Sequence, residues 1–303
     1  MRFNCGFLLK LLVVSLCIGI GGAPALAGGL KALTTPQELA LGQNFAEAVD
    51  RQFPLLRDPV MKWYVNLRGR QLADRSPRNN LPYFFRIIDT SEINAFAIPG
   101  GHIYINLGVL QVAENEVEIL GILSHEIGHV VGRHGAKQII RQQWASIALT
   151  SAIQRYPNYY AYLAGNLFGQ LGFLKLSRDA EREADELGFQ ILIQSGYDPH
   201  GMITMFEKLK ERYKREPNRL EKLFLTHPPT DERIQDLKAL LAQTTLPQGL
   251  RLNTPEFEEI KNRVTELYPA PQPEEEKDGK KSKDQGKDKD QRKDESPHLE
   301  AKQ

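Results

Sequence analysis

Apolar residues recur at helical spacing through most of the chain. Between Pro36 and about Ala73 they are three or four positions apart, after a Thr-Pro pair that suits an N-cap and first turn, so we expect two helices joined near Pro54. Residues 114–131 are almost continuously apolar, which predicts a helix that runs through the core. Further helices are predicted within 136–176, at 178–195 and at 199–214.

A shorter part of the chain has the pattern of strands. Residues 83–88 are aromatic and β-branched, and two short apolar runs, 94–98 and 102–106, flank a Pro-Gly-Gly turn that is typical of a hairpin. We therefore expect a small three-stranded antiparallel sheet. Together with the helices it predicts an α+β fold that is mostly helical, and no internal repeat is evident.

The first 27 residues have the pattern of a secretion signal. An apolar run at 7–20 is flanked by basic residues and is followed by Ala25-Leu26-Ala27, the small-x-small pattern of a signal-peptidase site. Residues 1–27 are therefore predicted to be a signal peptide, which implies export across the inner membrane to the periplasm. An uncleaved membrane anchor and lipidation at Cys17 are the alternatives.

The C-terminal residues 269–303 alternate charged and polar side chains with almost no apolar ones. Such a segment buries too little apolar surface to offset the entropy of ordering, so it is predicted to be a disordered tail, which leaves 28–268 as the folded domain. The formal charge of the whole chain is +1, so nucleic acid is not an expected partner. Both cysteines, Cys5 and Cys17, lie in the predicted signal, so the mature chain has neither disulfides nor thiolate metal sites.

The predicted core helix contains His125-Glu126-Ile127-Gly128-His129. Positions i and i+4 share one helix face, so the two imidazoles can meet one metal ion, for which Zn²⁺ is suited. Glu126 lies beside them, where its carboxylate can accept a proton from water at the metal. A chance occurrence of the motif is the alternative, but a His-Glu pair is costly to bury in an apolar helix without a metal or a charged partner.

A catalytic zinc generally takes three protein ligands, so a third one is needed. One known extension of this motif places a histidine where this chain has Gly135; His134 is one position off and is expected to be a helix-end residue. The alternative is a glutamate on a later helix, and the run 177–185 offers Glu181, with Asp185 on the same face. A solvated helix face is the competing interpretation of these two carboxylates.

These motifs, in this order, resemble the M48 family of zinc metallopeptidases over roughly residues 36–240. The resemblance implies a gluzincin-type metalloprotease domain in which His125, His129 and Glu181 hold one Zn²⁺ and Glu126 is the general base. It also implies that Asp185 accepts the far ring N–H of a ligand histidine, which would set the tautomer and orientation of that ring.

The later segment Thr226-His227-Pro228 also matches the pattern of that family. The resemblance implies that His227 lies near the metal, where it either stabilises the oxyanion or acts as a fourth ligand in a latent state; we favour the first role. Arg233 either orients this loop or is an ordinary surface arginine. His102 and His200 have no motif support as ligands, so structural roles are expected for them.

Two further segments bear on the substrate. Asn94-Ala95-Phe96-Ala97 is predicted to lie on an edge strand, which can pair with the backbone of an extended polypeptide; a purely structural role is the alternative. Residues 136–176 are rich in aromatic side chains and leucine, and core packing, a lid over the zinc, and a surface that contacts a membrane or a partner are the competing interpretations.

Together these features predict a zinc-dependent endopeptidase that hydrolyses unfolded or misassembled envelope proteins. One alternative is a chaperone or assembly factor that binds client proteins through the same zinc site and hairpin without cleaving them. Another is an amidase or other hydrolase that acts on a small substrate. The sequence does not indicate an oligomeric state.

Overall fold

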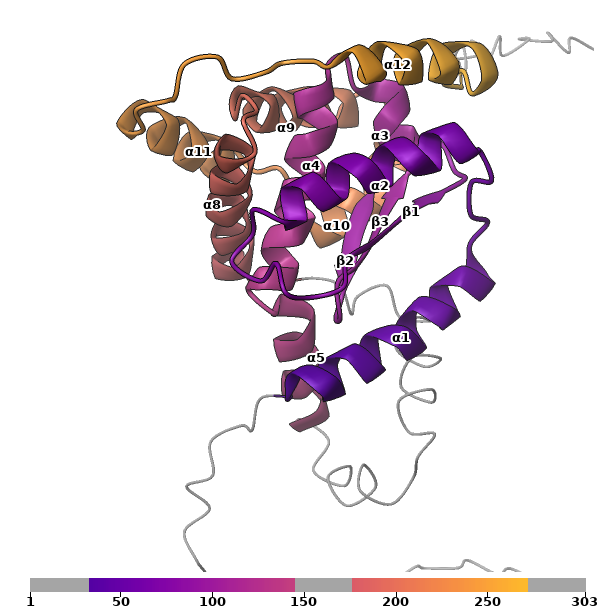
Figure 1. Cartoon of the computed structure of the whole chain (residues 1–303), viewed down its shortest axis with the longest axis vertical. Coiled ribbons are helices and arrows are strands. Elements are labelled where there is room, and N and C mark those ends of the chain that lie inside the picture. The colour runs from indigo at the N-terminus through magenta and orange to yellow at the C-terminus, as the bar shows by residue number, and fades with distance from the viewer. Residues whose placement is uncertain (1–32, 145–175, 272–303) are drawn as a thin grey trace, which may run out of the picture. The chain divides into compact units, whose positions relative to one another are not determined.

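Helices dominate the part of the chain that this computed structural model describes, residues 33–144 and 176–271 (Figure 1). The predicted signal peptide, most of the 136–176 segment and nearly all of the C-terminal tail lie outside the described residues. The two predicted N-terminal helices are confirmed as α1 (Thr35–Gln52) and α2 (Pro59–Ala73), which begin at the N-caps Thr34 and Asp58. The α+β prediction with a small sheet is also confirmed.

The sheet contains β1 (Phe84–Ile88), β2 (Ala95–Ile98) and β3 (His102–Asn106) in the order β1-β3-β2. The predicted hairpin is confirmed, because β2 and β3 are antiparallel. The prediction that the whole sheet is antiparallel is wrong, because β1 and β3 are parallel. The six-residue connection 89–94 joins β1 to β2, and it lets β3 enter between these two strands. As a result β2 is an edge strand within this sheet.

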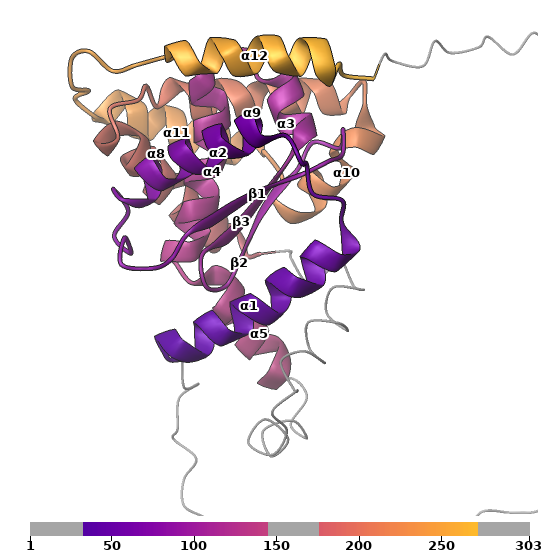
Figure 2. The same ribbon diagram turned by 45° about the vertical axis from the view of Figure 1, so that its right-hand side comes forward.

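Helices cover both faces of the sheet, and Figure 2 shows the strands between α1 and α2. On one face Phe45 and Val49 of α1 pack against Phe96 and Tyr104, and Ile139 of α5 (His134–Trp144) joins this cluster. The other face packs against α2 and α4 (Glu116–Val131) in the main core. Side chains of successive strand residues alternate between these two clusters.

Helix α4 is the centre of the fold. Every residue from Glu116 to Val130 is buried, as its apolar sequence predicts. Helix α8 (Arg178–Gln194) packs closely along it, because Gly128 has no side chain: an added Cβ there would lie 2.6 Å from the carbonyl oxygen of Ala184. This close packing brings the first turn of α8 next to the His-Glu motif.

The remaining helices surround this pair. α3 (Leu107–Val112) precedes α4, and α9 (His200–Tyr213), α10 (Pro217–Thr226), α11 (Asp231–Gln243) and α12 (Pro255–Leu267) follow α8. The prediction of helices at 178–195 and 199–214 is confirmed by α8 and α9, whereas α3, α10, α11 and α12 were not predicted.

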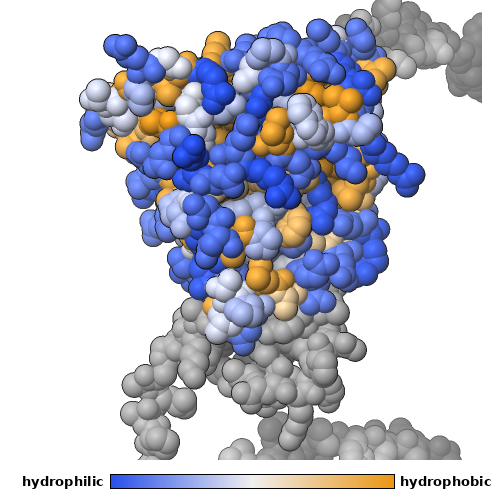
Figure 3. Space-filling view, in the orientation of Figure 1, coloured by the Kyte–Doolittle hydropathy of each residue, from blue (hydrophilic) through white to orange (hydrophobic). Residues whose placement is uncertain are grey.

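The exposed surface is mainly hydrophilic on the face shown in Figure 3, where hydrophobic residues form separate spots. The most exposed large apolar side chains among the described residues include Leu225, Leu267 and Trp63, at 56%, 54% and 53%. No helix within the described ranges has the length and apolar character that a bilayer crossing requires.

Candidate metal centre

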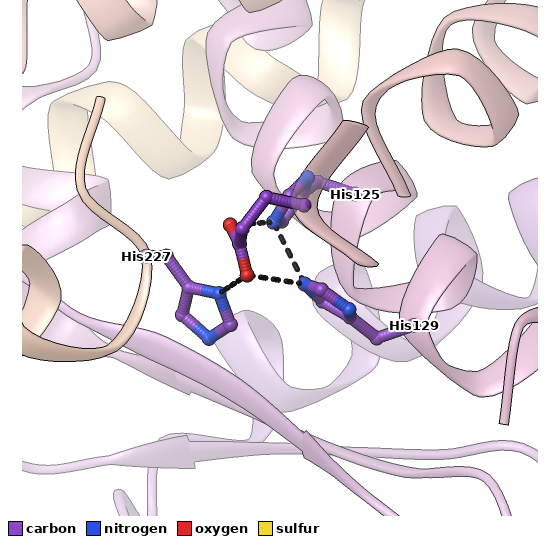
Figure 4. A group of neighbouring side chains, drawn as sticks. His125, His129 and His227 are labelled. Carbon is purple, nitrogen blue, oxygen red and sulfur yellow. Dashed lines mark hydrogen bonds and ion pairs between the residues drawn. The ribbon is translucent and has the colours of Figure 1, made fainter. Parts of the chain in front are cut away.

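Three helices bring together the side chains of the predicted zinc site. His125 and His129 project from one face of α4, and their Nε2 atoms lie 3.0 Å apart. Glu181 comes from the first turn of α8, and each of its oxygens lies 3.5 Å from one of these nitrogens. His227 follows the last residue of α10 and places its Nδ1 3.0 Å from Glu181 Oε1. Figure 4 shows the three imidazoles turned toward one common point.

The spacing of these groups fits a single metal ion. The four ligand atoms all lie within 4.8 Å of one another, and no side chain of the four is more than 6% exposed. A tetrahedral zinc with bonds of about 2.0–2.1 Å separates its donor atoms by about 3.3 Å, and four of the six separations here are 3.0–3.5 Å. Imidazole nitrogens with one carboxylate are a donor set that suits Zn²⁺.

His125 is held in place from behind by two buried charged residues. Its Nδ1 lies 2.8 Å from Asp185 Oδ1, so the ring donates there and its Nε2 is free to face the centre. Arg233 donates to both oxygens of Asp185 at 2.7 Å and also lies 2.9 Å from Glu181 Oε2. Asp185 therefore links α8 to α4 beside a ligand histidine, as the resemblance implied. Arg233, for which a surface position was the alternative, is buried and links α11 to α8.

His129 has a different support, which sequence reasoning missed. Its Nδ1 lies 2.8 Å from Nδ1 of His134, whose Nε2 lies 3.2 Å from Glu183 Oε2. His134 is the first residue of α5, as a helix-end role predicts, but it is only 4% exposed and it contacts a candidate ligand. The contact could have been predicted only from the position of His134, five residues after His129. The chain turns at Arg133, which has a φ of 56°, and this turn brings His134 back toward the His129 ring.

Glu126 lies beside the imidazoles in a buried position. Its Oε2 has no hydrogen-bond partner among the described residues, and a buried carboxylate oxygen without a partner is expected only where a ligand or water completes it. Burial raises the pKa of Glu126, against the opposing effects of His227 and His125. A raised pKa suits a carboxylate that accepts and returns a proton near neutral pH.

The charge states of the candidate ligands follow from their surroundings. Burial would raise the pKa of Glu181, but His227 and His129 lower it well below its usual range, so the carboxylate is ionised. Burial and the neighbouring His125 lower the pKa of His129, which keeps that ring neutral. Burial alone would lower the pKa of His125, but Asp185 and Glu181 raise it to about 9. Metal binding at neutral pH would therefore displace a proton from His125.

A pocket of about 480 Å³ opens beside these groups, and we call it the metal pocket. Its lining includes Glu126, His129, His227, Phe96 and Ala97. The last two belong to the edge strand β2, so the strand predicted to hold substrate borders the same space as the predicted base.

The chain matches the model of peptidase family M48 over residues 62–241, which is more than half of its length. The chain belongs to peptidase family M48. The resemblance seen in the motifs is thus confirmed, and membership of this family makes the chain a metallopeptidase.

Several curated relatives are similar to this chain. The beta-barrel assembly-enhancing proteases of Yersinia pestis and Escherichia coli K12 are 33% and 32% identical to it, over 68% of this chain and 44% of each relative. Metalloprotease YcaL of E. coli K12 is 30% identical over 54% of this chain and 64% of the relative. Mitochondrial metalloendopeptidase OMA1 of Schizosaccharomyces pombe is 26% identical over 67% of this chain and 59% of the relative. The chain spans less than half the length of the first two relatives.

The other histidines lie elsewhere among the described residues. His102 is buried on β3, where its ring stacks on Phe84 with centroids 4.6 Å apart. His200 is exposed and contacts Asp198 at the start of α9. Neither belongs to the group of candidate ligands.

Proposed function

We infer that this chain is a zinc-dependent endopeptidase that cleaves unfolded or misassembled proteins of the cell envelope. The observation that supports this most strongly is the convergence of His125, His129 and Glu181 beside the buried carboxylate of Glu126. The predicted signal peptide and the printed names of the beta-barrel assembly-enhancing protease relatives support a periplasmic location and an envelope substrate.

His125, His129 and Glu181 would hold the zinc ion. A zinc ion bound there supplies Lewis acidity, which polarises a substrate carbonyl and lowers the pKa of water toward about 7. Glu126 takes the proton from the attacking water and passes it to the nitrogen of the leaving amine. Asp185 and His134 keep the two ligand rings oriented through their Nδ1 atoms.

The edge strand β2 would bind the substrate backbone. The Asn106 N–H donates to the carbonyl oxygen of Asn94 at 2.9 Å. Because antiparallel pairs alternate between hydrogen-bonded and non-bonded positions, the backbone groups of Ala95 and Ala97 point away from β3, and a backbone hydrogen bond joins Ala97 to the carboxylate of Glu126. An extended polypeptide can add to that edge by main-chain hydrogen bonds, which suits substrates of varied sequence.

We assign His227 to a hydrogen bond with the carbonyl oxygen of the substrate. Its ring borders the metal pocket together with Glu126. Its position 3.0 Å from Glu181 also suits a fourth ligand in a latent state, and zinc K-edge absorption of the substrate-free and inhibitor-bound protein distinguishes the two roles by the number of nitrogen ligands.

The test is digestion of casein by the purified mature chain with and without a chelator, beside the Glu126→Gln variant. We expect Glu126→Gln to retain one zinc per chain and to lose cleavage by at least about 100-fold, while Glu258→Gln, an exposed glutamate on α12, behaves as the wild type. Preservation of every activity in Glu126→Gln would favour a client-binding protein instead. Hydrolysis of small amides without casein cleavage would favour an amidase.

A further inference from the structure

A second pocket lies along β2 beside the metal pocket. We call it the Asn94 pocket. Its lining includes Asn94 and Phe96 of the β2 segment, Asn106 at the end of β3, and Lys222, Leu225 and Thr226 of α10.

Two buried amide side chains in this lining each have an unpaired oxygen. Asn94 and Asn106 are only 6% and 4% exposed, and the Oδ1 atom of each has no hydrogen-bond partner among the described residues. A buried acceptor that is left unpaired is costly, so such atoms usually meet a ligand or an ordered water. Because the remaining wall is largely apolar, with Phe96 and Ile88 on the sheet side, the pocket favours a group with an apolar body and a hydrogen-bond donor.

The Asn94 pocket adjoins the metal pocket along one strand. Phe96 lines both pockets, and the consecutive residues Thr226 and His227 line one each. A strand rises about 3.3 Å per residue, so Asn94 is about 10 Å along β2 from Ala97, which borders the metal pocket. An extended chain added to β2 would therefore reach the Asn94 pocket within about three residues of the bond that faces Glu126.

We propose that the Asn94 pocket is a substrate subsite that selects a tyrosine or tryptophan side chain at one fixed position near the cleaved bond. The ring would pack on Phe96 and the apolar wall, and its O–H or N–H would donate to Asn94 or Asn106. The salt bridge between Lys222 and Glu92, at 2.7 Å, lies at the polar side of the same pocket. This inference rests on the proposed function, since it assumes that polypeptide lies along β2.

Peptide binding to the Glu126→Gln protein tests this subsite without requiring cleavage. A labelled ten-residue peptide of otherwise constant sequence carries tyrosine, phenylalanine or alanine at each position in turn, and its Kd is measured by fluorescence anisotropy. We expect one position where tyrosine binds at least about 10-fold more tightly than alanine and about fivefold more tightly than phenylalanine.

Two variants and a control locate that preference. Leu225→Ser alters a residue that is 56% exposed and so leaves the core intact; it should reduce the preference for tyrosine over alanine. Asn106→Leu leaves Asn94 as the remaining acceptor and should reduce the preference for tyrosine over phenylalanine while phenylalanine still binds. The matched control is Leu252→Ser, because Leu252 is 50% exposed and is not in this lining; it should change neither ratio.

The inference is overturned if no position prefers an aromatic residue, or if the preference survives Leu225→Ser. It is also overturned if Leu225→Ser abolishes self-association without affecting peptides, because the pocket would then belong to a second copy of the chain. A wild type that cleaves no polypeptide while the Glu126→Gln protein still shows the positional preference would refute the proposed function and leave the subsite standing.

Discussion

Replacement of Asp185 by asparagine tests how the fold supports the candidate metal centre. Asp185 accepts the Nδ1–H of His125 at 2.8 Å and two donors of Arg233 at 2.7 Å, in a site where it is 4% exposed. An asparagine of the same size keeps one acceptor oxygen but loses the charge, and it turns an NH₂ group toward Arg233 or His125. The variant should therefore fold with a less oriented His125 ring.

The magnitudes follow from burial. Loss of a carboxylate that supports a metal-binding histidine typically weakens metal affinity by about 10- to 100-fold, which is about 1.4–2.7 kcal/mol. Removing one partner of a buried ion pair costs about 3–5 kcal/mol of folding stability. We expect the lower end of that range, because Arg233 keeps its contact with Glu181 at 2.9 Å.

The assay is a competition titration of zinc against a chromophoric chelator, with urea unfolding of the same samples. The matched control is Asp236→Asn, which breaks a 3.2 Å pair with Arg182 in which both side chains are at least 40% exposed. Such a pair contributes about 0–1 kcal/mol and does not contact the centre. If Asp185→Asn bound zinc within twofold of the wild type, Asp185 would not orient a ligand and this reasoning would be refuted.

Two other changes probe the sheet and the helix pair. Burial and Arg86 lower the pKa of His102 to about 4. In the unfolded chain this ring takes up its proton near pH 6.5, so protonation favours the unfolded state. The free energy of unfolding should therefore fall by about 2–3 kcal/mol on account of His102 as the pH falls from 7 to 4. His102→Gln should show that much less acid sensitivity in urea titrations, and an unchanged pH profile would contradict the assignment. Gly128→Ala places a Cβ 2.6 Å from the Ala184 carbonyl oxygen, so it should lower the free energy of unfolding by about 1–3 kcal/mol. It should also lower the zinc content, because α8 is displaced. Full zinc content at wild-type stability would show that the helices need not pack so closely.

The helices and the hairpin could be predicted because their signals are local. The apolar run of α4, the Pro-Gly-Gly turn before β3 and the Thr-Pro start of α1 each specify a structure from neighbouring residues. The direction of β1 could not be predicted in this way. Its sequence is equally compatible with either edge of the hairpin, and the pairing with β3 depends on how the 89–94 connection passes the sheet.

The candidate site was predictable where residue types repeat at helical spacing, as in the pairs of α4 and α8. Its supporting contacts depend on tertiary packing, which spacing does not reveal. The contact of His134 with His129 arises from the turn between two helices. The Asn94 pocket arises because α10, which the sequence pattern did not predict, packs against the 89–94 connection that leads into β2.

Anomalous diffraction at the zinc edge, from crystals of the mature chain grown with zinc, would locate the metal ion among these side chains. We expect one strong peak per chain, within about 2.0–2.2 Å of His125 Nε2, His129 Nε2 and a Glu181 oxygen. A peak bound elsewhere, or a zinc that contacts the two histidines while Glu181 faces solvent, would contradict this expectation.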